Sequence, residues 1–177
     1  SSDLMSNVDA YFLVDANCSG LIVEGSLFKE NTVDASGGGL YVLYTNIDSI
    51  YETESTTSQR EIRETVISFE RSDFVGNSAN YGGAIILEKN STFSTSLRDL
   101  GMIFTTLFSN SKIENNTAYT FAGGFGALNL FNAHFSHDSQ NVSLGLTNMS
   151  FISNFAIEAG DAIYLQNSAM NLKTSEI

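Results

Sequence analysis

One residue pattern recurs four times along the 177-residue chain. Its clearest copy, from Ser72 to Leu87, has the form Ser-x-Phe-x-x-Asn-x-Ala, then a short step, then Gly-Gly-Ala and further apolar residues. The other copies begin at Ser26, Ser111 and Met149. Such a recurring unit is typical of solenoids, because each unit buries its apolar face only against its neighbours.

The spacing of apolar residues inside each unit is that of a β-strand. Side chains two residues apart point to the same face of a strand, and no i, i+3, i+4, i+7 stripe persists over a helix-length window. Counted between Ala10, Gly39, Ala84, Ala127 and Ala162, the units follow one another every 29 to 45 residues. The sequence therefore predicts an all-β fold, a right-handed parallel β-helix (β-solenoid) of about four coils.

We expect the whole chain, 1–177, to be one β-helix segment and a fragment of a longer solenoid. It begins at Ser1 without an initiator Met or a leader, which favours a processed or excised chain. The expected repeat units are about 10–42, 43–87, 88–130 and 131–165, and 166–177 is expected to start a further coil.

Residues at the same place in successive units should stack in columns, about 4.8 Å apart along the coil axis. Apolar columns are predicted for Phe28, Phe74, Ile113 and Phe151, and for Leu40, Ile85, Leu128 and Ile163. A polar column is predicted for Asn31, Asn77, Asn116 and Asn154. Their side-chain amides can bond from coil to coil, as in Asn ladders, and Asn tolerates the left-handed conformation of a turn. We therefore assign these Asn residues a structural role.

Composition excludes several classes of function. Acidic residues outnumber basic ones 20 to 8, and the formal net charge is −12. Neither a nucleic-acid partner nor a basic helix on a membrane surface is therefore expected. No apolar run approaches the roughly 20 residues of a membrane-spanning helix, so no direct membrane insertion is expected. The 42% of hydrophobic residues argue for a packed core and against disorder.

The repeat resembles the F-x-x-N and G-G-A-[I/L] repeats of the chlamydial polymorphic outer membrane proteins, and similar repeats in very large secreted or surface proteins of protists. Phe74-x-x-Asn77 followed by Gly82-Gly83-Ala84-Ile85 matches this pattern fully, and the resemblance covers roughly residues 10 to 165. It implies a right-handed parallel β-helix displayed outside the cell and used for adhesion or as a structural fibre.

Parallel β-helices also include enzymes that cut acidic polysaccharides. Glycoside hydrolysis needs paired carboxylates, but the coil position of Asp73 is held by Leu27, Lys112 and Ser150 in the other units. No such column of carboxylates is therefore expected, and the −12 charge would repel an anionic substrate. We expect no catalytic residue and no enzymatic activity.

Two further motifs are weak signals for a metal. His134-x-x-His137-Asp138 lacks a fourth ligand and is expected to lie in a surface loop. Gly123-Gly124-Phe125-Gly126 is similar to a calcium-binding nonapeptide, but Leu128 stands where its Asp should be. We interpret these glycines as a repeat corner followed by an insertion. No metal and no cofactor is expected.

Five N-x-[S/T] sequons make N-linked glycans a hypothesis for a secreted protein. Their Asn residues all lie outside the Asn column and are Asn17, Asn90, Asn115, Asn141 and Asn148. Cys18 has no second cysteine to pair with in the chain, so it is either a small buried apolar residue or is paired outside this segment.

These observations favour an extracellular or cell-surface structural scaffold, glycosylated, that forms or decorates a fibre. Its expected partners are proteins, either copies of itself or other fibre components. One alternative is an adhesin that binds a cell surface through its loops, for example the charged insertion between Leu43 and Val66. A second alternative is a β-helix polysaccharide lyase or hydrolase.

Overall fold

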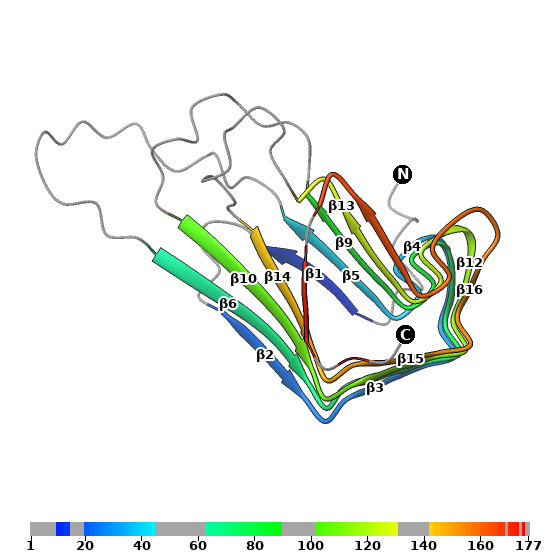
Figure 1. Ribbon diagram of the computed structural model, residues 1–177, viewed down its shortest axis with the longest axis horizontal. Coiled ribbons are helices and arrows are strands. Elements are labelled where there is room, and N and C mark those ends of the chain that lie inside the picture. The colour runs from blue at the N-terminus through cyan, green and yellow to red at the C-terminus, as the bar shows by residue number, and fades with distance from the viewer. Residues whose placement is uncertain are drawn as a thin grey trace, which may run out of the picture.

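The computed structural model describes residues 10–14, 20–44, 63–89, 102–130, 142–168, 170–173 and 175. The regular elements of this part of the chain are all β-strands, arranged in four sheets in which every pair of neighbours is parallel. We name the sheets A to D, and each contributes one side of every coil (Figure 1). The predicted all-β solenoid is confirmed.

Each sheet stacks its strands in chain order. Sheet A contains β1 (Ala10–Val14), β5 (Leu40–Tyr44), β9 (Ile85–Lys89), β13 (Phe125–Leu128) and β17 (Ile163–Gln166). Sheet B contains β2 (Leu21–Glu24), β6 (Arg63–Glu70), β10 (Met102–Ser109), β14 (Val142–Thr147) and β18 (Asn171–Lys173). Sheet C contains β3 (Leu27–Lys29), β7 (Asp73–Val75), β11 (Lys112–Glu114) and β15 (Ser150–Ile152). Sheet D contains β4 (Thr32–Ser36), β8 (Ser78–Tyr81), β12 (Thr117–Phe121) and β16 (Phe155–Ala156).

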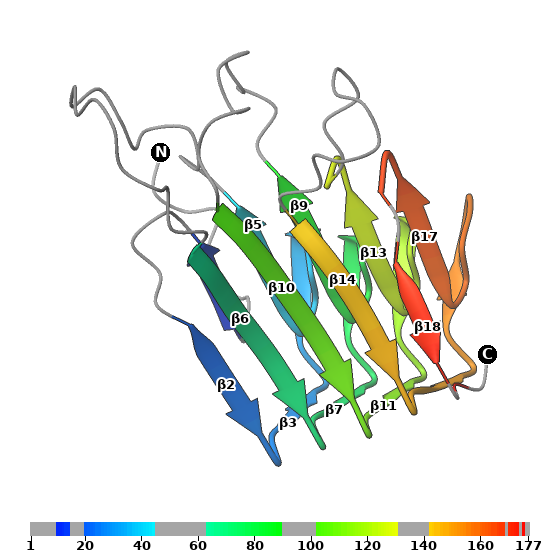
Figure 2. The same cartoon turned by 60° about the vertical axis from the view of Figure 1, so that its left-hand side comes forward.

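The coils wind in the right-handed sense. In Figure 1 the chain runs anticlockwise through sheets B, C, D and A. When the left-hand side is turned forward in Figure 2, the later coils move to the right, so they lie nearer the viewer in Figure 1. Anticlockwise winding toward the viewer is right-handed, the sense found in nearly all parallel crossover connections.

Four complete coils stack along the axis, and we number them coil 1 (β2–β5), coil 2 (β6–β9), coil 3 (β10–β13) and coil 4 (β14–β17). Strand β1 lies beside β5 before coil 1, and β18 lies beside β14 after coil 4. Equivalent Asn residues of successive coils are 46, 39 and 38 residues apart. The prediction of about four coils is confirmed.

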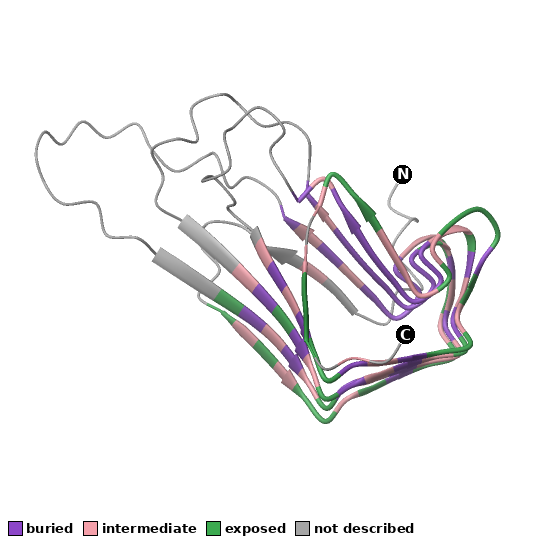
Figure 3. Ribbon diagram, in the orientation of Figure 1, coloured by how far each residue is buried: buried purple, intermediate pink, exposed green. Residues whose placement is uncertain are grey.

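The core consists of side-chain columns inside the coils, and Figure 3 colours the buried residues of the ribbon purple. The rings of Phe28 and Phe74 stack with centroids 4.6 Å apart and an interplanar angle of 3°. Phe69 and Phe108 stack in the same way at 4.7 Å and 7°. Both distances match the spacing of neighbouring strands, so each ring lies directly over the next. The register of sheet C places Phe28, Phe74, Ile113 and Phe151 in one column.

The prediction of the second apolar column is wrong at one position. Leu40, Ile85, Phe125 and Ile163 lie in register, so Phe125 takes the place predicted for Leu128. Phe125 is fully buried and contacts Phe108 edge to face. Leu128 follows three residues later and therefore points to the opposite face of the strand, in register with Glu88 and Gln166.

The Gly123-Gly124 pair explains this register. A Cβ atom on Gly123 would come within 2.5 Å of the carbonyl oxygens of Phe155 and Asp161 in coil 4. The same restriction holds for Gly83 in coil 2, whose Cβ atom would lie 2.5 Å from the carbonyl oxygen of Gly123. Gly123 and Gly124 are therefore the Gly-Gly pair of the repeat, and the predicted insertion after a corner glycine is wrong.

Candidate functional site

The corner between sheets C and D brings the four predicted Asn residues into one hydrogen-bonded column. Asn31 Nδ2 donates to Asn77 Oδ1 at 2.9 Å, and Asn77 Nδ2 donates to Asn116 Oδ1 at 3.0 Å. Asn116 Nδ2 donates to Asn154 Oδ1 at 2.9 Å. The side chains of Asn77 and Asn116 are fully buried, so this column runs through the interior of the solenoid.

Each buried amide in the column has all its bonding groups occupied. In Asn116, Nδ2 also donates to the backbone oxygen of Phe74 at 3.0 Å, and Oδ1 accepts the backbone N–H of Asn77 at 2.8 Å. Asn77 repeats both contacts, with Phe28 as the carbonyl acceptor. A primary amide has two N–H donors and an oxygen with two acceptor positions. An Asn side chain can therefore form hydrogen bonds to both neighbouring coils at this corner.

The left-handed conformation predicted for these Asn residues is wrong. The positive φ angles belong to the residue immediately before each one, namely Glu30, Gly76, Asn115 and Ser153, at 57°, 67°, 55° and 51°. The preceding residue makes the turn and faces outward, which leaves the Asn side chain free to point inward to the column. The role of Asn is thus hydrogen bonding rather than tolerance of a strained backbone.

A second polar column, of serines, lies at the corner between sheets B and C. Ser72 N–H donates to Ser111 Oγ at 2.9 Å, and Ser111 Oγ donates to the backbone oxygen of Ser109 at 2.8 Å. Ser26 and Ser72 make the same pair of contacts one coil earlier. Met149 interrupts the column, and the Oγ of Ser175 then accepts the Met149 N–H at 3.2 Å. The repeated serine two residues before the Phe position was the sequence signal for this column.

The solenoid ends, among the described residues, in an open edge formed by β15, β16 and β17. In coil 3 the corner N–H groups of Gly123 and Gly124 donate to the carbonyls of Gly160 and Asp161 at 3.0 and 2.9 Å. The equivalent N–H groups of coil 4 have no acceptor within the described part of the chain. They belong to Ser153, Asn154, Gly160, Asp161 and Ala162.

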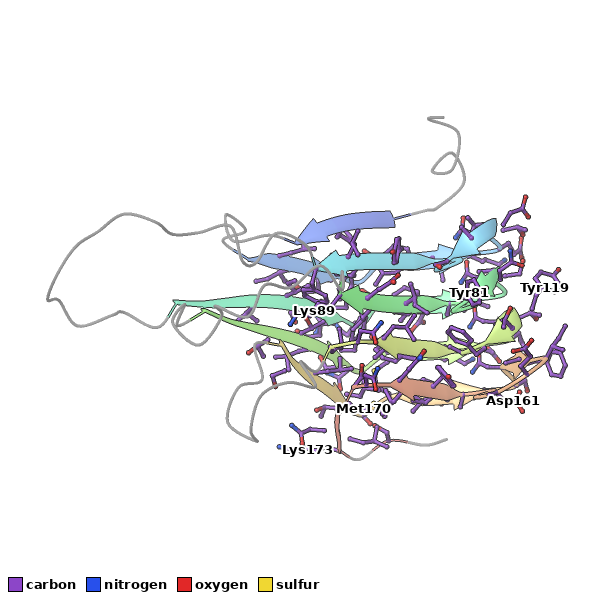
Figure 4. The ribbon with its side chains drawn as sticks, turned by 90° about the horizontal axis from the view of Figure 1, so that it is seen from above. Tyr81, Lys89, Tyr119, Asp161, Met170 and Lys173 are labelled. Carbon is purple, nitrogen blue, oxygen red and sulfur yellow. The ribbon has the colours of Figure 1, made fainter. Side chains whose placement is uncertain are left out.

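Apolar side chains are also uncovered at the open edge. Leu165 points inward in register with Ala127 and Leu87, yet it is 38% exposed, whereas those two are fully buried. Met170 and Ile163 are only partly buried against the core, and Figure 4 shows Met170 at the end of the stack. The edge of coil 4 thus combines backbone donors with an incompletely covered core.

Two carboxylates lie side by side on neighbouring coils of sheet B, but they do not continue into a column, because Ser109 takes the same place in coil 3. Glu24 and Glu70 are in register on sheet B, and Arg71 contacts both. The distance from Arg71 Nη1 to Glu70 Oε1 is 2.6 Å. All three side chains are substantially exposed. A guanidinium that pairs with both carboxylates makes this an ion-paired surface cluster.

Among the described residues, no three His, Cys, Asp or Glu side chains lie close enough together to hold a metal ion. His134, His137, Asp138 and Cys18 lie outside the described residues, and so does 45–62, most of the charged insertion. In the part of the chain that the structure covers, no helix has the length and apolar character needed to cross a bilayer.

Two of the five sequon Asn residues can be placed. Asn115 and Asn148 are both exposed turn residues, with φ angles of 55° and 51°. Asn148 Nδ2 donates to Asn110 Oδ1 at 2.8 Å, whereas Asn115 lies between the small residues Gly76 and Ser153 of the adjacent coils. Asn17, Asn90 and Asn141 lie outside the described residues.

The chain was also compared with known proteins. Protein-family models, curated proteins and solved structures gave no match. The resemblance to the F-x-x-N and G-G-A repeats of bacterial and protist surface proteins therefore stays a prediction. What this chain does has to be inferred from its columns, its open edge and its outer faces.

Proposed function

We propose that this chain is a structural scaffold, not an enzyme, and that it extends by stacking coil upon coil into a rod or fibre. The observation that carries the proposal is the open edge of coil 4. Four of its five N–H groups, those of Ser153, Asn154, Gly160 and Asp161, are equivalent to groups that bind the next coil at every earlier step, as Gly37, Gly82 and Ala122 do at one corner. Its expected partner is a coil of the same kind, from this chain, a second copy or another fibre component.

The energy available at such an edge is large enough to drive stacking. Each backbone hydrogen bond contributes a net of about 1 kcal/mol, and five donors await an acceptor in the described chain. Covering Leu165, Ile163 and Met170 adds the burial of apolar side chains, at roughly 25 cal/mol per Å². An unpaired sheet edge is a template for another strand, so the most favourable occupant is a coil with the same spacing.

The outer surface fits a scaffold outside the cell. A net charge of −12 opposes side-by-side aggregation of copies while leaving end-to-end stacking possible. The exposed turn position of Asn115, between two small residues, has room for an N-linked glycan that would not touch the columns. An extracellular or cell-surface location and occupied sequons belong to this proposal.

A pair of charge substitutions on one strand tests the stacking. Leu165→Lys places a cation in the inward column at the open edge, where solvent reaches it in the free chain but a stacked coil would bury it. Gln166→Lys adds the same charge to the outer face of the same strand. Sedimentation velocity and electron microscopy over a concentration series should show elongated assemblies for the wild type and for Gln166→Lys, and monomers for Leu165→Lys.

Circular dichroism on dilute samples serves as the folding control for both variants. A wild-type chain that stays monomeric at every concentration would contradict the proposal. So would Leu165→Lys chains that assemble as well as the wild type, because the interface would then lie elsewhere on the molecule.

A further inference from the structure

Two outward columns of sheet D change from polar to apolar along the solenoid axis. The register of the sheet places Thr32, Ser78, Thr117 and Phe155 in one outward column. A second outward column follows two residues later in each coil, where the register of β8 with β4 and β12 shifts, and contains Asp34, Asn80, Tyr119 and Ile157. Coils 1 and 2 contribute only polar side chains to these columns. Coils 3 and 4 contribute Tyr119, Phe155 and Ile157, which we call the apolar face.

The two halves of this surface differ in their internal contacts. In coils 1 and 2, Ser78 Oγ donates to Thr32 Oγ1 at 3.1 Å, and Asn80 Nδ2 donates to the backbone oxygen of Asp34. The apolar face is left to solvent, since Tyr119, Phe155 and Ile157 are 54%, 54% and 61% exposed. Figure 4 shows Tyr119 projecting from the rim of the solenoid.

The fold does not require these apolar residues. The inward positions of the same strands are Ala118 and Ala156, which are buried and complete the core. Polar residues occupy the outward positions of β4 and β8, and the two strands still pair in parallel, with a register shift between Val33 and Ser36. A cluster of exposed large apolar side chains marks an interaction surface.

The charges around the apolar face are of one sign. Glu158 follows Ile157 directly, and Asp161 lies on the same rim as Tyr119 in Figure 4. Asp161 Oδ1 accepts the backbone N–H of Ala156 at 2.9 Å, which holds this carboxylate beside β16. Neither carboxylate has a cationic partner among the described residues.

The strands and turns that carry these carboxylates contain no lysine or arginine that could compensate their charge. The segments that form sheet D and its corner to sheet A, 32–39, 78–84, 117–124 and 155–162, contain no Lys or Arg. The cation of the preceding sheet in coil 3, Lys112, is held by Glu114 at 2.5 Å. The apolar face therefore combines two exposed aromatic rings with uncompensated negative charge.

We infer that the apolar face binds a protein segment that carries basic side chains next to apolar ones. Apolar side chains of the segment would cover Ile157 and Phe155, while its Lys or Arg groups would lie against the aromatic rings and near Glu158 and Asp161. A cation over an aromatic ring contributes about 0.5–1 kcal/mol at exposed sites. Complementary charges also steer the encounter and exclude acidic partners.

This surface is separate from the open edge. Its side chains point away from the coil axis, so they remain accessible when a further coil stacks on coil 4. The inference therefore goes beyond the proposed scaffold function. It adds a binding site on the side of the rod for a protein segment with basic and apolar side chains.

The experiment uses the whole chain and a fluorescently labelled peptide with two leucines flanked on both sides by lysines. The test variant combines Tyr119→Asn, Phe155→Ser and Ile157→Asn, which introduces the residue types of the outward positions Ser78 and Asn80 of coil 2. Anisotropy titrations should show binding by the wild type, and binding at least about tenfold weaker by the variant, as expected when clustered anchor residues are removed.

A control and a charge variant define the site further. Thr32→Ala with Asp34→Asn alters the polar half of the same face and should leave binding unchanged. Glu158→Gln with Asp161→Asn keeps the oxygen that accepts the Ala156 N–H, and should weaken binding and reduce its salt dependence. Circular dichroism verifies that all variants fold.

Three outcomes would overturn the inference. The first is equal peptide binding by the wild type and the triple variant. The second is equal binding of a peptide in which glutamates replace the lysines. The third is failure to bind the peptide together with binding of a neutral glucan oligosaccharide that the triple variant loses, because the face would then be a carbohydrate site.

Discussion

Coil 2 and coil 4 have the same strands and the same corners, but different surroundings. Phe74, Asn77 and Leu87 of coil 2 are fully buried because a coil lies on each side. Of their counterparts in coil 4, Phe151 retains slight exposure and Leu165 is 38% exposed. One position of the repeat therefore contributes a different amount to stability depending on the number of coils that contact it. This difference can be measured.

The largest effect is expected in the aromatic column. Phe74→Ala should lower the free energy of unfolding by about 4 kcal/mol, because it opens a cavity between Phe28 and Ile113. Phe151→Ala, with one neighbouring coil, should lower it by about 2 kcal/mol in dilute solution. Urea unfolding of the two variants provides the comparison. Equal losses in the two variants would show that a second neighbouring coil adds nothing to the stability of this column.

The Asn column should show the same contrast at a smaller scale. Asn116→Ala leaves buried donors and acceptors without partners on both sides, which should cost about 3 kcal/mol. Asn154→Ala affects only its bonds to coil 3 and should cost about 1 kcal/mol. A larger loss for Asn154 than for Asn116 in urea unfolding would refute the claim that a second neighbouring coil adds to the stability of this column.

The serine column gives the smallest effect. Ser111→Ala removes an acceptor for the Ser72 N–H inside the solenoid and should cost about 1.5 kcal/mol. Ser175→Ala removes the equivalent bond to Met149 at the far end and should cost about 0.5 kcal/mol. Thermal unfolding followed by circular dichroism can rank the pair, and the reverse order would argue against a shared role of these serines.

The interior of the coil could largely be predicted from the sequence, because stacking forces the same residue types to recur. Phe28, Phe74, Asn77 and Asn116 recur at one spacing for this reason. The register around Phe125 was mistaken because Gly123-Gly124 and Gly126 offer two similar alignments. Only the contact of a Gly123 Cβ atom with the carbonyls of coil 4 distinguishes between them.

The outer faces could not be predicted in the same way. Side chains that point to solvent need not match those of the next coil, so no repeat marks them. The pairing of Glu24 with Glu70 through Arg71 depends on the register of β2 and β6. The gathering of Tyr119, Phe155 and Ile157 likewise emerges only when β12 and β16 are placed side by side.

Amide hydrogen exchange as a function of protein concentration tests the central claim, that the edge of coil 4 takes up a further coil, most directly. The N–H groups of Gly123 and Gly124 are bonded to coil 4 and should exchange slowly at every concentration. Those of Gly160, Asp161 and Ala162 should exchange fast in dilute wild-type samples and at least about tenfold more slowly in concentrated ones. Fast exchange of these three amides at all concentrations would contradict the claim.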